Sequence, residues 1–305
     1  ADLYTPEQGR RLFGFVAAGG TAGAIAGPFF ATVLAPKLGP ANLLIVSAVM
    51  LEVASQCALW VVRAKGAARG PESSLSAAVA GTEPALEERP LGGSVFAGIP
   101  QLLRSRYLLS LSAHVLLFTM TATVLYFQQA NITSRAFTSS GERTSFFAQI
   151  DLAVNIVSLL VQAAGTGRLM KRIGAGAALA LVVVVTAIAF GGLAASPGLA
   201  VLFVAMTARR SAGYALERPA REVLFTVVSR EEKYKAKNFI DTVVYRGGDV
   251  ATAWLQQALT AGGITMRGMV VGSLPVTGLW LLLVYSLGRR QETLAREKQA
   301  DTLDR

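Results

Sequence analysis

The feature that most constrains this chain is a series of apolar stretches, each long enough to cross the hydrocarbon core of a lipid bilayer. A core about 30 Å thick needs about 20 residues of α-helix. Helices are expected because backbone polar groups in lipid must pair within their own segment, and the stretches exceed the roughly ten residues of a barrel strand. The predicted spans are 12–35, 42–62, 107–130, 145–166, 173–195, 199–222, 239–262 and 268–287. We therefore predict an all-α polytopic membrane protein with eight transmembrane helices.

The composition and the distribution of charge agree with this fold class. Charged residues make up 16% of the 305 residues, whereas a soluble domain contains about 25%. The net charge is +10, but the apolar stretches leave no basic face on a soluble fold, so nucleic acid is not an expected partner. Of the 29 Lys and Arg residues, 20 fall on one side of the predicted spans and four on the other. This bias predicts that both termini are cytoplasmic.

The sequence carries no signal of catalysis. A single cysteine, Cys57, and a single histidine, His114, exclude a disulfide framework and a Cys/His zinc site. The glycine-rich phosphate loop, the nucleophile elbow and the dinucleotide-binding fingerprint are also missing from the sequence. We expect no enzymatic activity, no metal and no organic cofactor.

One long polar connector divides the predicted spans. Its composition, rich in Ala, Ser, Gly, Pro and Glu, is typical of a flexible loop between domains. We predict the last two helices of one bundle over 1–63, a cytoplasmic interdomain loop over 64–106, a six-helix bundle over 107–288 and a cytoplasmic tail over 289–305. The sequence begins at Ala1 and not at methionine, so we expect an N-terminally incomplete protein.

Glycine spacing in the first span carries a family resemblance. Eight residues separate Gly14 from Gly23, and Gly27 and Pro28 follow after three more. This spacing resembles the antiporter motif in the fifth helix of the major facilitator superfamily, and segment 167–174 resembles the loop between its eighth and ninth helices. The resemblance implies a twelve-helix fold, of which this chain carries helices 5–12. Ordinary close packing of helices through small residues remains the alternative interpretation.

A more local resemblance covers residues 217–249. In this segment a proline and a basic–acidic pair precede two lysines, an aspartate, an arginine and a glycine. The residues are Pro219, Arg221, Glu222, Lys235, Lys237, Asp241, Arg246 and Gly248. Their order is similar to the segment before and within the eleventh helix of the ATP/ADP translocase family of nucleotide transporters. The resemblance implies that the substrate is a nucleotide or a related phosphorylated metabolite, exchanged for a counter-substrate.

Ionisable side chains within the spans are the candidate functional residues, since each costs about 3 kcal/mol or more when exposed to lipid. At 100° per residue, Arg210, Tyr214, Glu217 and Arg221 form one stripe along a helix. We expect this stripe to face a central cavity, where Arg210, Tyr214 and Arg221 bind the substrate. In the alternative interpretation Glu217 and Arg221, four residues apart, merely neutralise each other.

The following span contains a second charged group. Arg246 and Asp249 are three residues apart and can pair on one helix face, and Asp241 lies near the cytoplasmic boundary. A paired arginine can exchange its carboxylate for a phosphate or carboxylate of the substrate, because its planar fork suits either oxyanion. We expect Arg246 to bind the substrate, and Glu217, Asp241 and Asp249 to be the partners displaced.

Several other polar residues have two possible roles. The lysines that precede this span form either a cytoplasmic funnel for anions or a solvated loop; they are Lys233, Lys235 and Lys237. A set at the other end of the membrane either lines an outer mouth or anchors the interface; it comprises Tyr126, Gln128, Gln129 and Asn131.

Two carboxyl groups interrupt otherwise apolar spans. Glu52 and Asp151 are either proton-coupling sites or members of interhelical pairs. His114 is expected to be a packing residue, because its own span offers no nearby acidic residue for a proton relay.

These observations predict a secondary active transporter that carries an organic anion by alternating access. One alternative is a proton-coupled efflux transporter of drug-like or metabolic compounds, in which Glu52 and Asp151 matter more than the arginines. Another is a non-transporting membrane receptor or scaffold. We expect a protein of the bacterial inner membrane that is monomeric at full length, with lipid and a small anionic solute as its partners. We do not expect these eight helices to transport alone, because the site lies between two bundles.

Overall fold

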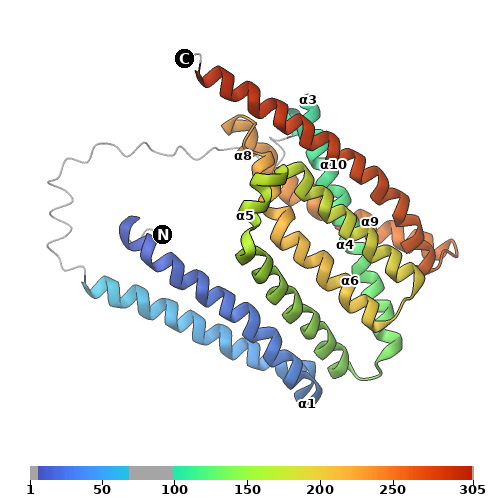
Figure 1. Ribbon diagram of the computed structural model, residues 1–305. Coiled ribbons are helices and arrows are strands. Elements are labelled where there is room, and N and C mark those ends of the chain that lie inside the picture. The colour runs from blue at the N-terminus through green and yellow to red at the C-terminus, as the bar shows by residue number, and fades with distance from the viewer. Residues whose placement is uncertain (1–5, 69–98, 304–305) are drawn as a thin grey trace. The chain divides into compact units, whose positions relative to one another are not determined.

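The structure, a computed structural model, describes residues 6–68 and 99–303, and every regular element in these two ranges is helical (Figure 1). The elements are α1 (Pro6–Ala68), α3 (Ile99–Arg104), α4 (Arg106–Ala136), α5 (Ser140–Ala195), α6 (Leu199–Ala212), the π-helical turn η2 (Gly213–Glu217), α7 (Arg218–Leu224), α8 (Arg230–Phe239), the π-helical turn η3 (Ile240–Val244), α9 (Tyr245–Ala261) and α10 (Met266–Leu303). The chain forms two compact units. The first contains α1 and residues 139–149, and the second contains the other helices and the rest of α5.

The first unit is built on a sharp bend in α1. Gly39 has φ 77° and ψ 161°, a conformation that glycine adopts without steric cost. The two arms on either side of it lie side by side and antiparallel (Figure 1). The Ser145 hydroxyl of α5 donates a 2.8 Å hydrogen bond to the Thr32 carbonyl. Gly141 permits this approach, since a Cβ there would lie 2.7 Å from the Ala35 carbonyl oxygen.

The predicted glycine motif lies in the first arm of α1. A Cβ added at Gly23 or Gly27 would meet no atom within 4 Å in the part of the chain that the structure describes. The surroundings of Gly14 lie outside the described residues. The Pro28 carbonyl accepts a 2.8 Å hydrogen bond from the Thr32 hydroxyl, one turn further along α1. Close packing of this motif against another helix therefore stays a prediction.

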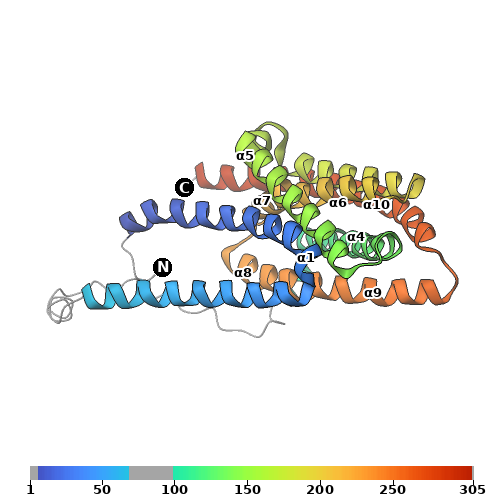
Figure 2. The same ribbon diagram turned by 90° about the horizontal axis from the view of Figure 1, so that it is seen from below.

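The second unit is arranged around α4. This helix packs against α6, α9, α10 and η3, and Figure 2 shows it between α9 on one side and α6 and α10 on the other. The fully buried side chains of its core include Leu108, Leu111 and Trp280. Helices α5 and α10 come into backbone contact at Gly176 and Gly288, where neither residue has a side chain to separate them.

Within residues 6–68 and 99–303, four helices are long and apolar enough to cross a membrane, and they lie within α1, α4, α5 and α10. Helix α1 holds two predicted spans, one on each side of Gly39. Helix α5 likewise holds two, separated by Gly165 and Gly174, whose φ angles are 113° and 80°. The predicted count of eight transmembrane helices stays a prediction.

The two remaining predicted spans are interrupted by π-helical turns. The span 199–222 comprises α6, η2 and most of α7, and the span 239–262 comprises η3 and α9. Such turns contain one residue more than an α-helical turn and often occur at functional sites. Pro219 is the second residue of α7, one residue after the end of η2, and a proline in the first turn of a helix is tolerated despite its missing N–H.

The predicted connector and tail are partly helical. The loop predicted over 64–106 contains the end of α1 and all of α3, and its residues 69–98 lie outside the described part. The tail predicted over 289–305 continues α10 without a break as far as Leu303.

Candidate functional site

A buried carboxylate on η2 is the centre of the candidate site. Only 2% of Glu217 is exposed. Its Oε1 atom lies 3.2 Å from Nε of Arg221, one turn further along the chain. The same oxygen lies 3.7 Å from Nε2 of His114, which comes from α4 and is completely buried. A buried carboxylate requires such partners, because an isolated charge is strongly disfavoured in an apolar environment.

Arg221 joins this carboxylate to a second one. Its Nη1 atom donates a 2.7 Å hydrogen bond to Oδ1 of Asp241 on η3. The guanidinium therefore bridges the two π-helical turns, and the Glu217–Arg221 pair expected from their spacing is present. His114, Glu217, Arg221 and Asp241 form a continuous series, which we call the ionic chain. It runs from a fully buried ring to a carboxylate that is 36% exposed.

His114 is held on its other side by Trp280 of α10. The indole Nε1 donates a 3.0 Å hydrogen bond to Nδ1 of the imidazole. Since that nitrogen accepts, the proton of the neutral ring is on Nε2, which faces Glu217. His114 is buried, as expected, but its acidic neighbour comes from a different helix. The residues of the histidine's own span give no sign of this neighbour.

Arg209 is a further buried cation, and it is not among the site residues predicted from the sequence. Its Nη2 donates a 2.6 Å hydrogen bond to the Phe118 carbonyl, and its guanidinium lies 4.3 Å from the centroid of the Phe118 ring. Its electrostatic neighbours include Glu217 and Tyr245. The sequence signal that could have indicated Arg209 is its position in the middle of an apolar stretch.

The predicted stripe along the sixth span divides between two sets of partners. Arg210 forms a 2.6 Å ion pair with Asp151 of α5, while Glu217 and Arg221 belong to the ionic chain. Tyr214 lies between these sets, and its ring is covered by the guanidinium of Arg218 at 4.5 Å. Asp151 is thus one member of an interhelical pair. The sequence allowed this interpretation beside that of a proton-coupling site.

Arg246 lies apart from the ionic chain. Its side chain is 78% exposed, and its Nη1 is 3.7 Å from Oδ2 of Asp249. Asp249 also accepts a 2.8 Å hydrogen bond from the Thr123 hydroxyl of α4. The two residues are neighbours, as their spacing predicts, but the distance between them leaves the guanidinium accessible to another oxyanion.

The predicted lysine funnel lies on α8. Lys237 donates to both carboxylate oxygens of Glu222, at 2.6 and 2.8 Å. Lys235 is half-buried, and the side chain of Lys233 lies outside the described residues. The funnel stays a prediction. In the first unit, Glu52 accepts a 2.7 Å hydrogen bond from Gln56.

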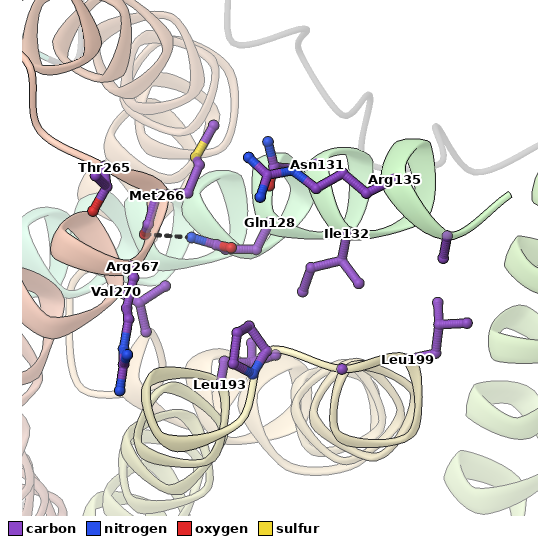
Figure 3. A pocket seen from close by; sticks show the side chains of 13 residues that line it. Gln128, Asn131, Ile132, Arg135, Leu193, Leu199, Thr265, Met266, Arg267 and Val270 are labelled. Carbon is purple, nitrogen blue, oxygen red and sulfur yellow. Dashed lines mark hydrogen bonds between the residues drawn. The ribbon is translucent and has the colours of Figure 1, made fainter. Parts of the chain in front are cut away.

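A cavity of about 430 Å³ lies near the C-terminal end of α4 (Figure 3). Gln128 crosses it to donate a 2.6 Å hydrogen bond to the Met266 carbonyl. The other polar residues in its lining are Asn131, Arg135, Thr265 and Arg267. Gln128 and Asn131 were predicted to line an outer mouth or to anchor the interface, and in the structure they line this cavity. Within the described ranges, His, Cys, Asp and Glu side chains form no group of three that could hold a metal.

Comparison with known proteins identifies a family for most of the chain. A family model described as Major Facilitator Superfamily matches residues 1–234. The match includes α1 to α7 and, with them, His114, Glu217 and Arg221 of the ionic chain. No curated protein matches the chain.

Proposed function

Because this chain belongs to the major facilitator superfamily, we propose that it carries a small organic anion across a membrane by alternating access. Its family, together with the four long apolar helices of the described part of the chain, makes it an integral membrane protein and a transporter of the major facilitator type. The substrate class is argued from the ionic groups of the second unit.

One observation carries the proposal: a single guanidinium, that of Arg221, is shared between two carboxylates, Glu217 and Asp241. An arginine held in this way is neutralised when no substrate is present, and it can exchange either carboxylate for a phosphate or carboxylate of the substrate. The exchange keeps the buried charges compensated throughout. Asp241 is the partner to be displaced, because it is more exposed than Glu217.

Two other arginine–carboxylate pairs offer the same exchange. Arg210 pairs with Asp151 at 2.6 Å, and Arg246 lies 3.7 Å from Asp249. A substrate with several negative groups can engage more than one arginine, which favours a polyanion over a monocarboxylate. Tyr214, four residues after Arg210 in the chain, stacks its ring against the guanidinium of Arg218 at 4.5 Å.

We assign the substrate to the nucleotides or related phosphorylated metabolites, exchanged for a counter-substrate. The support is the order of charged residues over 217–249, together with the concentration of arginines. Lys235 and Lys237 would attract such anions from the cytoplasm.

Counterflow of labelled ATP tests this function directly. Proteoliposomes containing the native-length protein and loaded with unlabelled ATP should accumulate the labelled nucleotide. Arg221→Ala and Arg246→Ala should lower the rate by about ten- to a hundredfold, the value of a lost charge-assisted hydrogen bond. Arg289→Ala is the matched control, because Arg289 is exposed and its guanidinium donates to the neighbouring Tyr285 hydroxyl instead of a carboxylate of the site. Counterflow that is indifferent to Arg221→Ala would contradict the proposed site.

We also propose that both termini are cytoplasmic, that the membrane is a bacterial inner membrane, and that the native-length protein is monomeric. The orientation rests on the excess of Lys and Arg in the segments that share the termini's side. Protease digestion of a C-terminal tag in right-side-out vesicles and in inverted vesicles tests it: only inverted vesicles should lose the tag. Light scattering in detergent tests the oligomeric state.

A further inference from the structure

The cavity near the C-terminal end of α4 has the size and the enclosure of a binding site (Figure 3). Its volume is about 430 Å³, and small-molecule sites measure roughly 300–1,000 Å³. The end of α4, the connection from α5 to α6 and the start of α10 enclose it, all within the second unit. It shares no lining residue with the ionic chain.

The floor and the rim of this cavity differ in chemistry. The aliphatic residues Ile132, Leu193 and Val270 line it and are buried, whereas Arg135 and Arg267 line it and are exposed. A ligand with an apolar body gains free energy by burying that body against the floor. Its polar group then lies at the rim, beside the arginines.

The two arginines lack a compensating carboxylate. The segments that build the cavity, 107–141, 152–216 and 250–291, contain no Asp or Glu. Within the described residues Arg135 forms no ion pair, and Arg267 donates through Nε to the Ala194 carbonyl at 2.8 Å. This bond leaves the two Nη groups of Arg267 for a ligand. A guanidinium fork matches the two oxygens of a carboxylate or phosphate, so an oxyanion is the fitting partner.

The predicted topology makes the position of these arginines informative. Lys and Arg are concentrated on the predicted cytoplasmic side, and four face the opposite side: Lys37, Arg135, Arg143 and Arg267. Basic residues are disfavoured there by the rule that orients membrane proteins. Arg135 and Arg267 are the two that belong to the second unit, and both line this cavity. Orientation in the membrane does not explain their shared position, whereas a shared anionic ligand does.

The backbone adds to the positive potential of the cavity. Helix α6 begins at Leu199 after Gly198, which supplies no side-chain cap, and both residues line the cavity. Helix α10 begins at Met266 in the same lining. The N–H groups in the first turn of a helix favour an anion. Gln128 is 4% exposed, and its hydrogen bond to the Met266 carbonyl holds the start of α10 against α4.

We propose that this cavity binds an amphiphilic anion, a molecule with a carboxylate or phosphate head and an aliphatic body. The arginines at the rim bind the head, and the buried aliphatic floor contacts the body. The site is separate from the proposed transport of a substrate anion and does not depend on it.

Two sources can supply a ligand of this chemistry. The predicted span 107–130 ends beside the cavity and the predicted span 268–287 begins there, so an anionic phospholipid can present its headgroup at this level of the membrane. A free organic anion can reach the same exposed arginines from the external solution. The experiments below treat the two sources separately.

Equilibrium binding of labelled octanoate tests the free anion. The native-length protein is placed in nanodiscs of zwitterionic phosphatidylcholine, and empty nanodiscs correct for octanoate dissolved in the lipid. The double variant Arg135→Gln/Arg267→Gln should lower the affinity by about ten- to a hundredfold, the value of a lost charge-assisted hydrogen bond. Lys37→Gln is the matched control, because Lys37 is an exposed cation on the same predicted side and does not line the cavity. It should bind as the wild type does.

The length of the ligand tests the apolar floor. From butyrate to octanoate, the affinity of the wild type should rise about fourfold for each methylene group that is buried. A surface that attracts anions through charge alone would bind both acids equally. Equal affinities for butyrate and octanoate therefore overturn the proposed amphiphile.

Native mass spectrometry tests the phospholipid. The protein is released from nanodiscs that contain phosphatidylglycerol and phosphatidylcholine in equal amounts, and the retained lipids are counted. The wild type and Lys37→Gln should retain more phosphatidylglycerol than the double variant. Retention that depends on the arginines, without octanoate binding, assigns the site to a lipid headgroup; octanoate binding without such retention assigns it to a free anion. If neither ligand depends on Arg135 and Arg267, the proposal is overturned. Neither experiment uses ATP, so the result is distinct from that of the counterflow assay.

Discussion

Gly176 of α5 and Gly288 of α10 are so close that a Cβ added to either residue would lie 2.6 Å from the Cα of the other. Both obstacles are backbone atoms, which cannot rotate away as a side chain can. This contact sets the distance between the two helices. It lies beside the core that contains Trp280 and Leu287, and so it fixes the position of the helix that carries Trp280.

We therefore predict that Gly288→Ala destabilises the protein by about 1–3 kcal/mol, the usual effect of overpacking a core. Gly278→Ala in the same helix is the control, since a Cβ there meets no atom within 4 Å in the described structure. That change should be neutral or mildly stabilising, because alanine favours the helix by about 1 kcal/mol over glycine. Thermal unfolding followed by circular dichroism measures both. Equal melting temperatures for the two variants would refute the role of the contact.

The hydrogen bond from Trp280 to His114 should select the tautomer of the imidazole. Trp280→Phe removes the donor, so no indole N–H holds Nδ1 as the accepting nitrogen of the ring. Because His114 is the single histidine of the sequence, ¹⁵N NMR with labelled histidine reports on it alone. In the neutral ring the wild type should carry its proton on Nε2, and Trp280→Phe should show a larger share of the Nδ1–H tautomer.

Trp254→Phe provides the matched control for this experiment, since Trp254 is 70% exposed and Trp280 is fully buried. Its histidine spectrum should equal that of the wild type. Tautomer populations that are identical with and without the Trp280 indole would show that the hydrogen bond does not set the tautomer.

Removing the guanidinium of the ionic chain should leave a buried charge uncompensated. We expect Arg221→Ala to lower stability by about 3 kcal/mol or more. Adding Glu217→Gln in the same molecule should restore much of that loss, because the carboxylate then no longer needs a cation. Chemical unfolding in nanodiscs or mild detergent measures the double-mutant cycle.

The exposed pair between Lys237 and Glu222 offers the comparison. Lys237→Ala should change stability by less than about 1 kcal/mol, as is usual for surface ion pairs. If Arg221→Ala lowers stability no more than Lys237→Ala does, then water reaches Glu217 and the ionic chain is not shielded from solvent.

Cysteine labelling distinguishes a side chain on a wet passage from one on the lipid-facing surface. In a Cys57→Ser background, Arg246→Cys and Leu282→Cys replace side chains that are 78% and 67% exposed. A charged thiol reagent should modify the first in membranes and leave the second unmodified, since lipid covers an apolar outer surface. ATP should slow the reaction at position 246. Equal labelling at the two positions, with no protection by ATP, would favour a receptor or scaffold over a transporter.

Much of the helical character could be predicted from the sequence, because long apolar stretches leave few alternatives in a membrane. The pairs that depend on helical spacing, such as Glu217 with Arg221 and Arg246 with Asp249, could be predicted in the same way. The contact of Glu217 with His114 could not, since the two residues lie on helices far apart in the sequence. No periodicity within one span indicates which face of another span it meets.

The surplus residue in η2 sets the phase of every later side chain in that helix. An uninterrupted α-helix would bring Arg210 and Glu217 within about 20° of each other, and both would then meet the same neighbour. The π-helical turn rotates its last residue, Glu217, and the residues that follow by about 100°, so that Arg210 meets α5 while Glu217 meets α4. Deleting one residue between 213 and 217 would leave the helix hydrogen-bonded. The side chains of Glu217 and Arg221 would then turn away from their partners on α4 and η3.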